Sequence, residues 1–278
     1  MLIVNGKIVS VEHFLSGEQR INFEVEKDAY NVTWLYDNDE ELITLIYLCK
    51  HIKYNGGELV TLIMPYIPNA RMDRVYNSKE EVFTLKYFAE IINSLGFKNI
   101  WVENAHSNVS LGLLNSVEDL NLNDLLVHDI NTVLDKIKLE TKNEIKLFYP
   151  DAGAVKRYSK LLSKEYLYGN KTRRWDNGEI QGLEVLGGTP DGCDILIIDD
   201  ICSKGGTFYY AAKQLKEMGA KNIYLYITHC ENSIFNGTFG EEHKNLLDTG
   251  LIKHVYTTQS IYRGTDNRIT VVGGRYNI

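Results

Sequence analysis

The fold is decided by the stretch Ile195-Leu-Ile-Ile-Asp-Asp-Ile-Cys-Ser-Lys-Gly-Gly-Thr207. Four apolar residues lead into two carboxylates, and an amphipathic run follows directly after the glycines. This order predicts a buried strand over 195–198, a tight loop, and a helix that begins at the loop. Glycines let the backbone approach a phosphate closely, and the first N–H groups of a helix point toward it. We therefore expect a phosphate site here, with Asp199 and Asp200 beside it to bind ribose hydroxyls or a hydrated Mg²⁺.

The composition is that of a soluble globular chain of 278 residues, 44% hydrophobic and 24% charged. A net charge of −7 provides no basic field for nucleic acid, which we exclude as a partner. No apolar run reaches the ~18 residues of a membrane helix, so we expect no membrane association. The four cysteines lie far apart without metal-ligand spacing, which is typical of reduced thiols and favours a cytoplasmic location.

Strand-like and helix-like segments alternate along most of the chain. The strands are predicted over 32–36, 59–64, 100–102, 145–149, 195–198 and 223–227, and the helices over 39–54, 78–95, 154–162 and 208–218. Ser78 and Glu81 form a capping box for the second helix. The rhythm predicts an α/β fold of mostly parallel sheets flanked by helices. The pattern loosens between 114 and 135, so we expect two domains, 1–125 and 126–278, with the last residues packing back on the first domain.

Two further motifs follow predicted strands of the first domain, at the strand ends where open α/β sheets bind ligands. Arg71, Asp73 and Arg74 lie in a loop after the strand over 59–64. The two guanidinium groups could hold a polyphosphate, or the loop could be a surface segment with one ion pair. His106 follows the strand over 100–102, and it could bind a metal or a phosphate or serve only as a hydrogen-bonded loop residue.

Two more motifs lie in the second domain. Asp151 follows the strand over 145–149, and its carboxylate could be a ligand or only the N-cap of the next helix. The segment 169–178 is rich in cations and turn formers, with Lys171, Arg173 and Arg174 among them. It could be a mobile loop that closes over a reacting phosphate, or a basic hairpin without a catalytic role.

In chain order, these motifs resemble those of the ribose-phosphate diphosphokinases, the synthetases of phosphoribosyl pyrophosphate (PRPP). Asp199–Thr207 resembles the PRPP loop of type I phosphoribosyltransferases. The segments that resemble the synthetases are Phe14-Leu-Ser-Gly-Glu18, Pro65-Tyr66 with Ala70-Arg-Met-Asp-Arg74, His106 with Gly112-Leu-Leu114, Pro150-Asp-Ala-Gly153, Lys171-Thr-Arg173 and Thr228-His229.

The resemblance implies two phosphoribosyltransferase-like domains, with the ATP side in the first and the ribose 5-phosphate side in the second. It implies transfer of the diphosphoryl group of ATP to O1 of ribose 5-phosphate, giving PRPP and AMP, with Mg²⁺ as the cofactor and a dimer-based homo-oligomer as the assembly. By this similarity, ATP is bound by Phe14, Glu18, Arg71, Asp73 and Arg74, and ribose 5-phosphate by Asp199, Asp200, Ser203, Lys204, Gly205, Gly206 and Thr207. Lys171, Arg173 and His106 would be catalytic, and His106 and Asp151 would hold the metal.

The chain departs from the family pattern at Ser16, Met72, Asn104, Ser203 and Lys204. Ser203 and Lys204 stand where the phosphate loop of the family has Asp-Thr. Two other functions are compatible with these motifs. One is a phosphoribosyltransferase that consumes PRPP, against which the separate N-terminal half argues. The other is a catalytically silent homologue that regulates a partner synthetase, against which the retained Lys171 and Arg173 argue.

Overall fold

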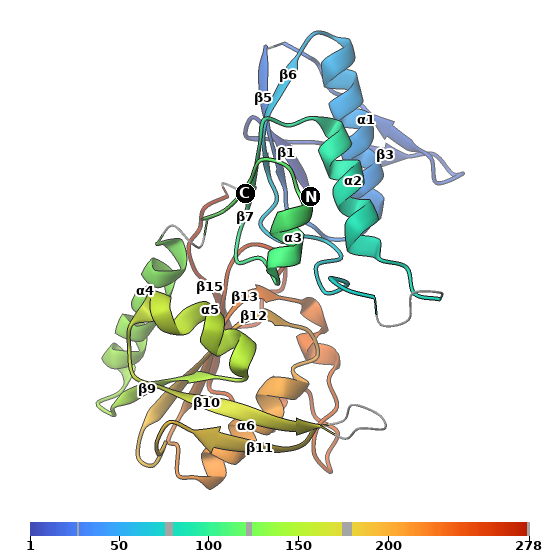
Figure 1. The fold of residues 1–278 in the computed structure, drawn as a ribbon. Coiled ribbons are helices and arrows are strands. Elements are labelled where there is room, and N and C mark those ends of the chain that lie inside the picture. Colours follow the sequence, from blue (N-terminus) through green and yellow to red (C-terminus); the bar gives the residue numbers. More distant parts are fainter. Residues whose placement is uncertain (27, 76–79, 121–123, 174–179, 277–278) are drawn as a thin grey trace. The chain divides into compact units, whose positions relative to one another are not determined.

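The computed structural model describes residues 1–26, 28–75, 80–120, 124–173 and 180–276, and it divides into two compact units, Met1–Asn123 and Asp124–Tyr276 (Figure 1). Each unit contains a mostly parallel sheet flanked by helices, which confirms the predicted fold class. The division of ATP and ribose 5-phosphate binding between two domains stays a prediction.

The sheet of the first unit has the strand order β2-β1-β5-β6-β7-β8. Strands β5 to β8 are parallel, whereas β1 is antiparallel to both β2 and β5. Two further strands, β3 and β4, form a separate antiparallel ribbon. The strands are β1 Leu2–Val4, β2 Lys7–Ile8, β3 Val11–His13, β4 Gln19–Ile21, β5 Ala29–Trp34, β6 Glu58–Ile63, β7 Asn99–Val102 and β8 Val117–Asp119, and the helices are α1 Glu40–Tyr54, α2 Thr84–Leu95 and α3 Asn108–Leu113.

Helix α1 forms as its apolar spacing predicts. Its buried face, which includes Leu45, Leu48 and Ile52, joins β5, β6 and α2 in one hydrophobic core (Figure 1). At its start, the Oδ1 atom of Asn38 accepts a hydrogen bond from the backbone N–H of Glu40 at 3.0 Å. The helix ends at Tyr54 with Asn55 as its C-cap, as predicted from Asn55 and the glycines that follow it.

Helix α2 begins later than predicted. It starts at Thr84, so Glu81 precedes it, and Ser78 lies outside the described residues. The stripe that faces the core begins at Leu85 and runs to Leu95, whereas Val82 is 59% exposed. Because tertiary packing supplies most of the stability of a helix, the segment before this stripe has little to hold it helical. The predicted stop at Gly96 is confirmed, with Gly96 in the left-handed conformation.

The sheet of the second unit has the strand order β11-β10-β9-β12-β13-β14-β15, and only the β10–β11 pair is antiparallel. The strands are β9 Ile145–Tyr149, β10 Tyr166–Arg173, β11 Ile180–Leu186, β12 Asp194–Cys202, β13 Ile223–Cys230, β14 His254–Thr257 and β15 Ile269–Val271. The α-helices are α4 Leu125–Glu140, α5 Ala152–Leu162 and α6 Gly206–Glu217, and the short 3-10 helices are η2 Asn232–Asn236 and η3 Leu247–Thr249.

The central strands of this sheet are buried on both faces. Side chains alternate along a strand, so Ile195 and Ile197 of β12 pack in one core with α6, while Leu196 and Ile198 pack in another with α4 and α5. Continuous apolar runs of this kind are typical of parallel strands covered on both sides.

Two differences from the predicted structure concern the region around the phosphate loop and the segment between the units. Strand β12 continues beyond Ile198 to Cys202, because β13 extends beside it and pairs as far as Cys202 with Cys230. The segment 114–135, predicted to be loosely patterned, contains β8 and the start of α4. Strand β8 has only three residues and pairs at the sheet edge, so it carries little periodicity of its own.

Candidate active site

The predicted phosphate loop joins β12 to α6. Ser203, Lys204 and Gly205 connect the two elements, and α6 begins at Gly206. Gly205 has φ +91, and a Cβ atom at this position would lie 2.7 Å from Cδ2 of Leu246. Only glycine fits this backbone and this spacing without movement of its neighbours. The strand–loop–helix arrangement is therefore confirmed, while phosphate binding by Ser203–Thr207 stays a prediction.

The paired acids lie within β12, just before the loop. Asp200 is 4% exposed, and its Oδ2 atom lies 2.9 Å from Nη1 of Arg157, which comes from α5. Burial raises the pKa of Asp199 well above its usual range, and the carboxylates of Asp200 and Asp151 raise it further. Three acids thus act on one another here, while Arg157 offsets the charge of Asp200.

Arg157 is not among the site residues expected from the sequence. It follows Asp151 by six residues in α5, and the strand alternation that puts Leu196 and Ile198 on the α5 face puts Asp200 there as well. The pairing of an arginine with an acid on a neighbouring strand depends on this packing, which the sequence motif alone does not contain.

Asp151 is the N-cap of α5. Its Oδ1 atom accepts a hydrogen bond from the backbone N–H of Ala154 at 3.1 Å. Of the two interpretations left open by the sequence, the cap is therefore confirmed. The cap uses one carboxylate oxygen, and metal binding by Asp151 stays a prediction.

The basic segment begins in strand β10. Lys171 pairs with Leu183 and Arg173 pairs with Ile180 across the β10–β11 hairpin. Arg174 lies outside the described residues. The backbone of Lys171 and Arg173 is thus part of a paired strand, and their predicted catalytic role is untested.

In the first unit, His106 lies in the turn between β7 and α3. The carboxylate of Asp119, the last residue of β8, holds this turn by accepting hydrogen bonds from the backbone N–H groups of Asn104 and Ala105, each at 2.8 Å. Asn104 has the left-handed φ of +48 that asparagine tolerates. Sequence reasoning missed Asp119, because the three-residue strand that carries it, Val-Glu-Asp, has too few apolar residues to show a strand pattern.

The predicted ATP residues lie on two loops of the first unit. Arg71 and Arg74 are exposed in the segment after β6, and Nε of Arg74 lies 3.1 Å from Oδ1 of Asp73. Phe14, which is 56% exposed, and Glu18 lie at the turn of the β3–β4 ribbon. The hydroxyl of Ser16 donates a hydrogen bond to Glu18 Oε2 at 2.7 Å. Ser16 stands where the family has an acid, and its hydroxyl can donate a hydrogen bond to Glu18, which an ionised acid could not do.

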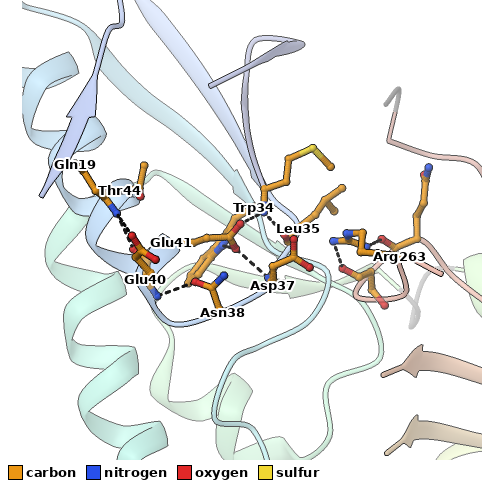
Figure 2. A network of polar contacts seen from close by, with 12 residues as sticks. Gln19, Trp34, Leu35, Asp37, Asn38, Glu40, Glu41, Thr44 and Arg263 are labelled. Atoms are coloured by element: carbon orange, nitrogen blue, oxygen red, sulfur yellow. Dashed lines mark hydrogen bonds and ion pairs between the residues drawn. The ribbon is translucent and has the colours of Figure 1, made fainter. Parts of the chain in front are cut away.

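Polar contacts connect the ribbon to α1 (Figure 2). Gln19 of β4 accepts a hydrogen bond from the hydroxyl of Thr44 at 2.9 Å, and its amide lies 3.4 Å from Oε1 of Glu40. Hydrogen bonds from His13 and Gln19 lower the pKa of Glu40. A neighbouring acid, Glu41, accepts hydrogen bonds from the indole N–H of Trp34 and the backbone N–H of Asp37, each at 2.9 Å (Figure 2). These contacts fix the ribbon and the end of β5 to the first turn of α1.

Neither a metal cluster nor a membrane helix is found in the described part of the chain. Its histidine, cysteine, aspartate and glutamate side chains form no group of three or more that could hold a metal ion by themselves. Of the helices within these residues, none combines the length and the apolar character required to cross a bilayer.

Comparisons with known proteins relate the whole chain to one family. Residues 3–96 match the model of the N-terminal domain of ribose phosphate pyrophosphokinase. The ribose-phosphate pyrophosphokinase of Mycoplasma genitalium is 28% identical over 93% of this chain and 76% of its own length. That of Sulfolobus acidocaldarius is 27% identical over 96% of this chain and 89% of its own length.

The fold is also that of a solved relative. The crystal structure of phosphoribosylpyrophosphate synthetase from Mycobacterium smegmatis superposes with a TM-score of 0.72 at 19% identity, over 95% of this chain and 85% of the other. Sequence matches that span both units therefore show that the chain is similar over nearly its whole length to the ribose-phosphate pyrophosphokinases, and it shares the fold of a solved phosphoribosylpyrophosphate synthetase.

Proposed function

We propose that the chain transfers the diphosphoryl group of ATP to O1 of ribose 5-phosphate, giving PRPP and AMP. The observation that carries this proposal is the β12–α6 junction, where two acids precede a glycine loop that opens into a helix N-terminus. This arrangement suits a sugar phosphate, since the acids can accept from ribose hydroxyls and the helix N-terminus can bind the phosphate. The relatives that match both units are named for this reaction.

Positioning and charge neutralisation are the main tasks of an enzyme in phosphoryl-type transfer. We assign ribose 5-phosphate to Asp199, Asp200 and the loop Ser203–Thr207. Arg71 and Arg74 would hold the phosphates of ATP, and Phe14 and Glu18 would contact its base. Lys171 and Arg173 would stabilise the charge of the transferring group. In this assignment the acids orient the ribose so that O1 faces the diphosphoryl group.

We further propose Mg²⁺ as the cofactor, because the family reaction moves a charged polyphosphate and generally requires a divalent metal. Mg²⁺ prefers oxygen ligands and takes many of them from water and substrate phosphates, so one or two carboxylates suffice. Asp151, in electrostatic contact with Asp199, offers such an oxygen, and His106 is the predicted ligand of the first unit. When bound, the ion would neutralise charge on the phosphates.

We also propose a dimer-based homo-oligomer in the cytoplasm. The four cysteines are all free thiols and all buried, which suits a reducing compartment. ATP and ribose 5-phosphate are the proposed small-molecule partners.

The test is AMP release from ATP in the presence of Mg²⁺, with and without ribose 5-phosphate. We expect AMP only when both substrates are present, with PRPP formed in equal amount. A folded protein that releases no AMP under these conditions would be a silent homologue. PRPP loss that depends on an added nucleobase would instead identify a phosphoribosyltransferase.

A further inference from the structure

The side chains of Ser203, Ser233 and Glu231 form a hydrogen-bond relay beside the phosphate loop. The Oγ atoms of Ser203 and Ser233 lie 3.1 Å apart, and the Oγ atom of Ser233 lies 2.7 Å from Oε2 of Glu231. All three side chains are half-buried. Glu231 follows β13, and Ser233 lies in the short helix η2. The relay therefore connects the end of β13 to the first residue of the loop.

The chemistry of the three groups fixes the direction of their protons. A carboxylate oxygen can only accept, so Ser233 donates its single hydroxyl proton to Glu231. Ser233 then has only lone pairs to offer Ser203, so the 3.1 Å contact requires Ser203 to be the donor. The hydroxyl proton of Ser203 therefore points toward Ser233. Only the lone pairs of the Ser203 oxygen remain for the substrate, so Ser203 can act only as an acceptor toward it.

Backbone contacts hold this geometry. The N–H group of Glu231 donates to the carbonyl of Cys202 at 2.9 Å, next to Ser203. Further along, a Cβ atom on Gly237 would lie only 2.5 Å from the carbonyl oxygen of Lys204. The segment that carries Glu231 and Ser233 thus packs directly against the loop, and Ser203 has a fixed partner on that side.

We propose that Glu231 and Ser233 are positioning residues that keep Ser203 a hydrogen-bond acceptor toward the substrate. This inference rests on the proposed function, in which the loop binds the 5-phosphate. A phosphate dianion is itself an acceptor, so it gains no hydrogen bond from a serine whose proton is held elsewhere. The relay therefore weakens phosphate binding and leaves Ser203 suited to a donor, such as a ribose hydroxyl. It also links Ser203, at a position where the family has an acid, to the carboxylate of Glu231 through the single hydroxyl of Ser233.

Ser233→Ala tests the direction of the relay without changing any charge. The freed hydroxyl of Ser203 can then donate to the phosphate, so we expect the KM for ribose 5-phosphate to fall about tenfold, the size of one charge-assisted hydrogen bond. The kcat and the KM for ATP should change by less than about twofold, within the error of such differences. Glu231→Gln should also lower the KM for ribose 5-phosphate. The side-chain amide can donate to Ser233, which can then donate to Ser203, so the hydrogen-bond direction reverses and the proton of Ser203 is free for the phosphate.

Two controls separate the relay from simple electrostatics. In a Ser203→Ala background, Ser233→Ala should no longer lower the KM. The proposal would be overturned if Glu231→Gln lowered the KM for ribose 5-phosphate while Ser233→Ala left it unchanged or raised it. The effect would then come from loss of the Glu231 charge and not from the direction of the hydrogen bonds. Melting temperatures of all variants show whether each is folded.

A second measurement needs no substrate. Ser203→Ala should change the unfolding equilibrium constant about fivefold in the wild-type protein and less than about twofold in the Ser233→Ala background, because the two hydroxyls interact. Equal effects in both backgrounds would overturn the relay. If the coupling is present but the wild-type protein releases no AMP, the relay stands and the proposed reaction fails.

Discussion

Replacement of Arg157 by glutamine should destabilise the second unit by about 2 kcal/mol. Nη1 of Arg157 lies 2.9 Å from Oδ2 of Asp200, whose side chain is only 6% exposed. Removing one partner of a fully buried ion pair costs about 3–5 kcal/mol, because the remaining charge loses its compensation. The Arg157 side chain is 26% exposed, so water can replace part of this contact, and we reduce the cost accordingly.

Urea unfolding followed by circular dichroism measures this change in the free energy of unfolding. In thermal unfolding, we expect the Tm to fall by about 4–8 °C for a unit of this size. Lys156→Gln is the matched control, because it removes the same charge from an exposed neighbour and should change stability by less than about 0.5 kcal/mol. Arg157→Gln should also raise the KM for ribose 5-phosphate, since Asp200 loses the contact that orients it.

The double variant decides whether the ion pair is responsible. If it is, Asp200→Asn and Arg157→Gln together should destabilise the protein by at least about 1 kcal/mol less than the sum of the single effects. Additive effects within about 0.3 kcal/mol would refute the reasoning, because the arginine would then stabilise the unit through packing alone.

Three other substitutions test the site. Gly205→Ala should cost about 3 kcal/mol, since it combines a left-handed backbone with a close contact, whereas Gly192→Ala at φ +72 meets no neighbouring atom and should cost about 1 kcal/mol in the same unfolding assay. Asp199→Asn should make the protein more stable at pH 8 and less active. Because the folded pKa of Asp199 is raised, the wild-type protein gains stability as the pH falls, so a pH series of melting temperatures should show the difference shrinking. Lys171→Ala should lower kcat about 100-fold with ATP binding and Tm nearly unchanged, and normal turnover would contradict its assignment.

The main elements of both sheets could be predicted because their periodicity is local. The strand over 145–149 has the predicted bounds, since burial on a fixed face leaves a clear spacing of apolar residues. Helix α5 ends at Leu162 as predicted, although it begins two residues earlier than predicted, at Ala152. The short strands β1 and β2 were missed, although Asn5-Gly6 between them is a strong hairpin signal with φ angles of +47 and +81.

The candidate site was less predictable, because its contacts join residues that are distant in sequence. The loop Ser203–Thr207 could be located from its own residues. By contrast, Asp119 supports the turn before His106 from a separate strand, and Ser233 reaches Ser203 from a segment after β13. These partners depend on which strands lie side by side, and that order is set by the packing of the whole unit.

The position of β12 has a consequence for the timescale of motion at the site. Residues 195–197 of this strand lie between β9 and β13 and are covered on both faces, so their amide protons should exchange with solvent only when the whole unit opens. Asp199 and Asp200 follow this segment directly, and β12 stays paired with β13 beside them. Asp199 and Asp200 therefore remain in place during local fluctuations. Any rearrangement that accompanies substrate entry would have to occur around the acids, which serve as the stationary reference for the arriving ribose.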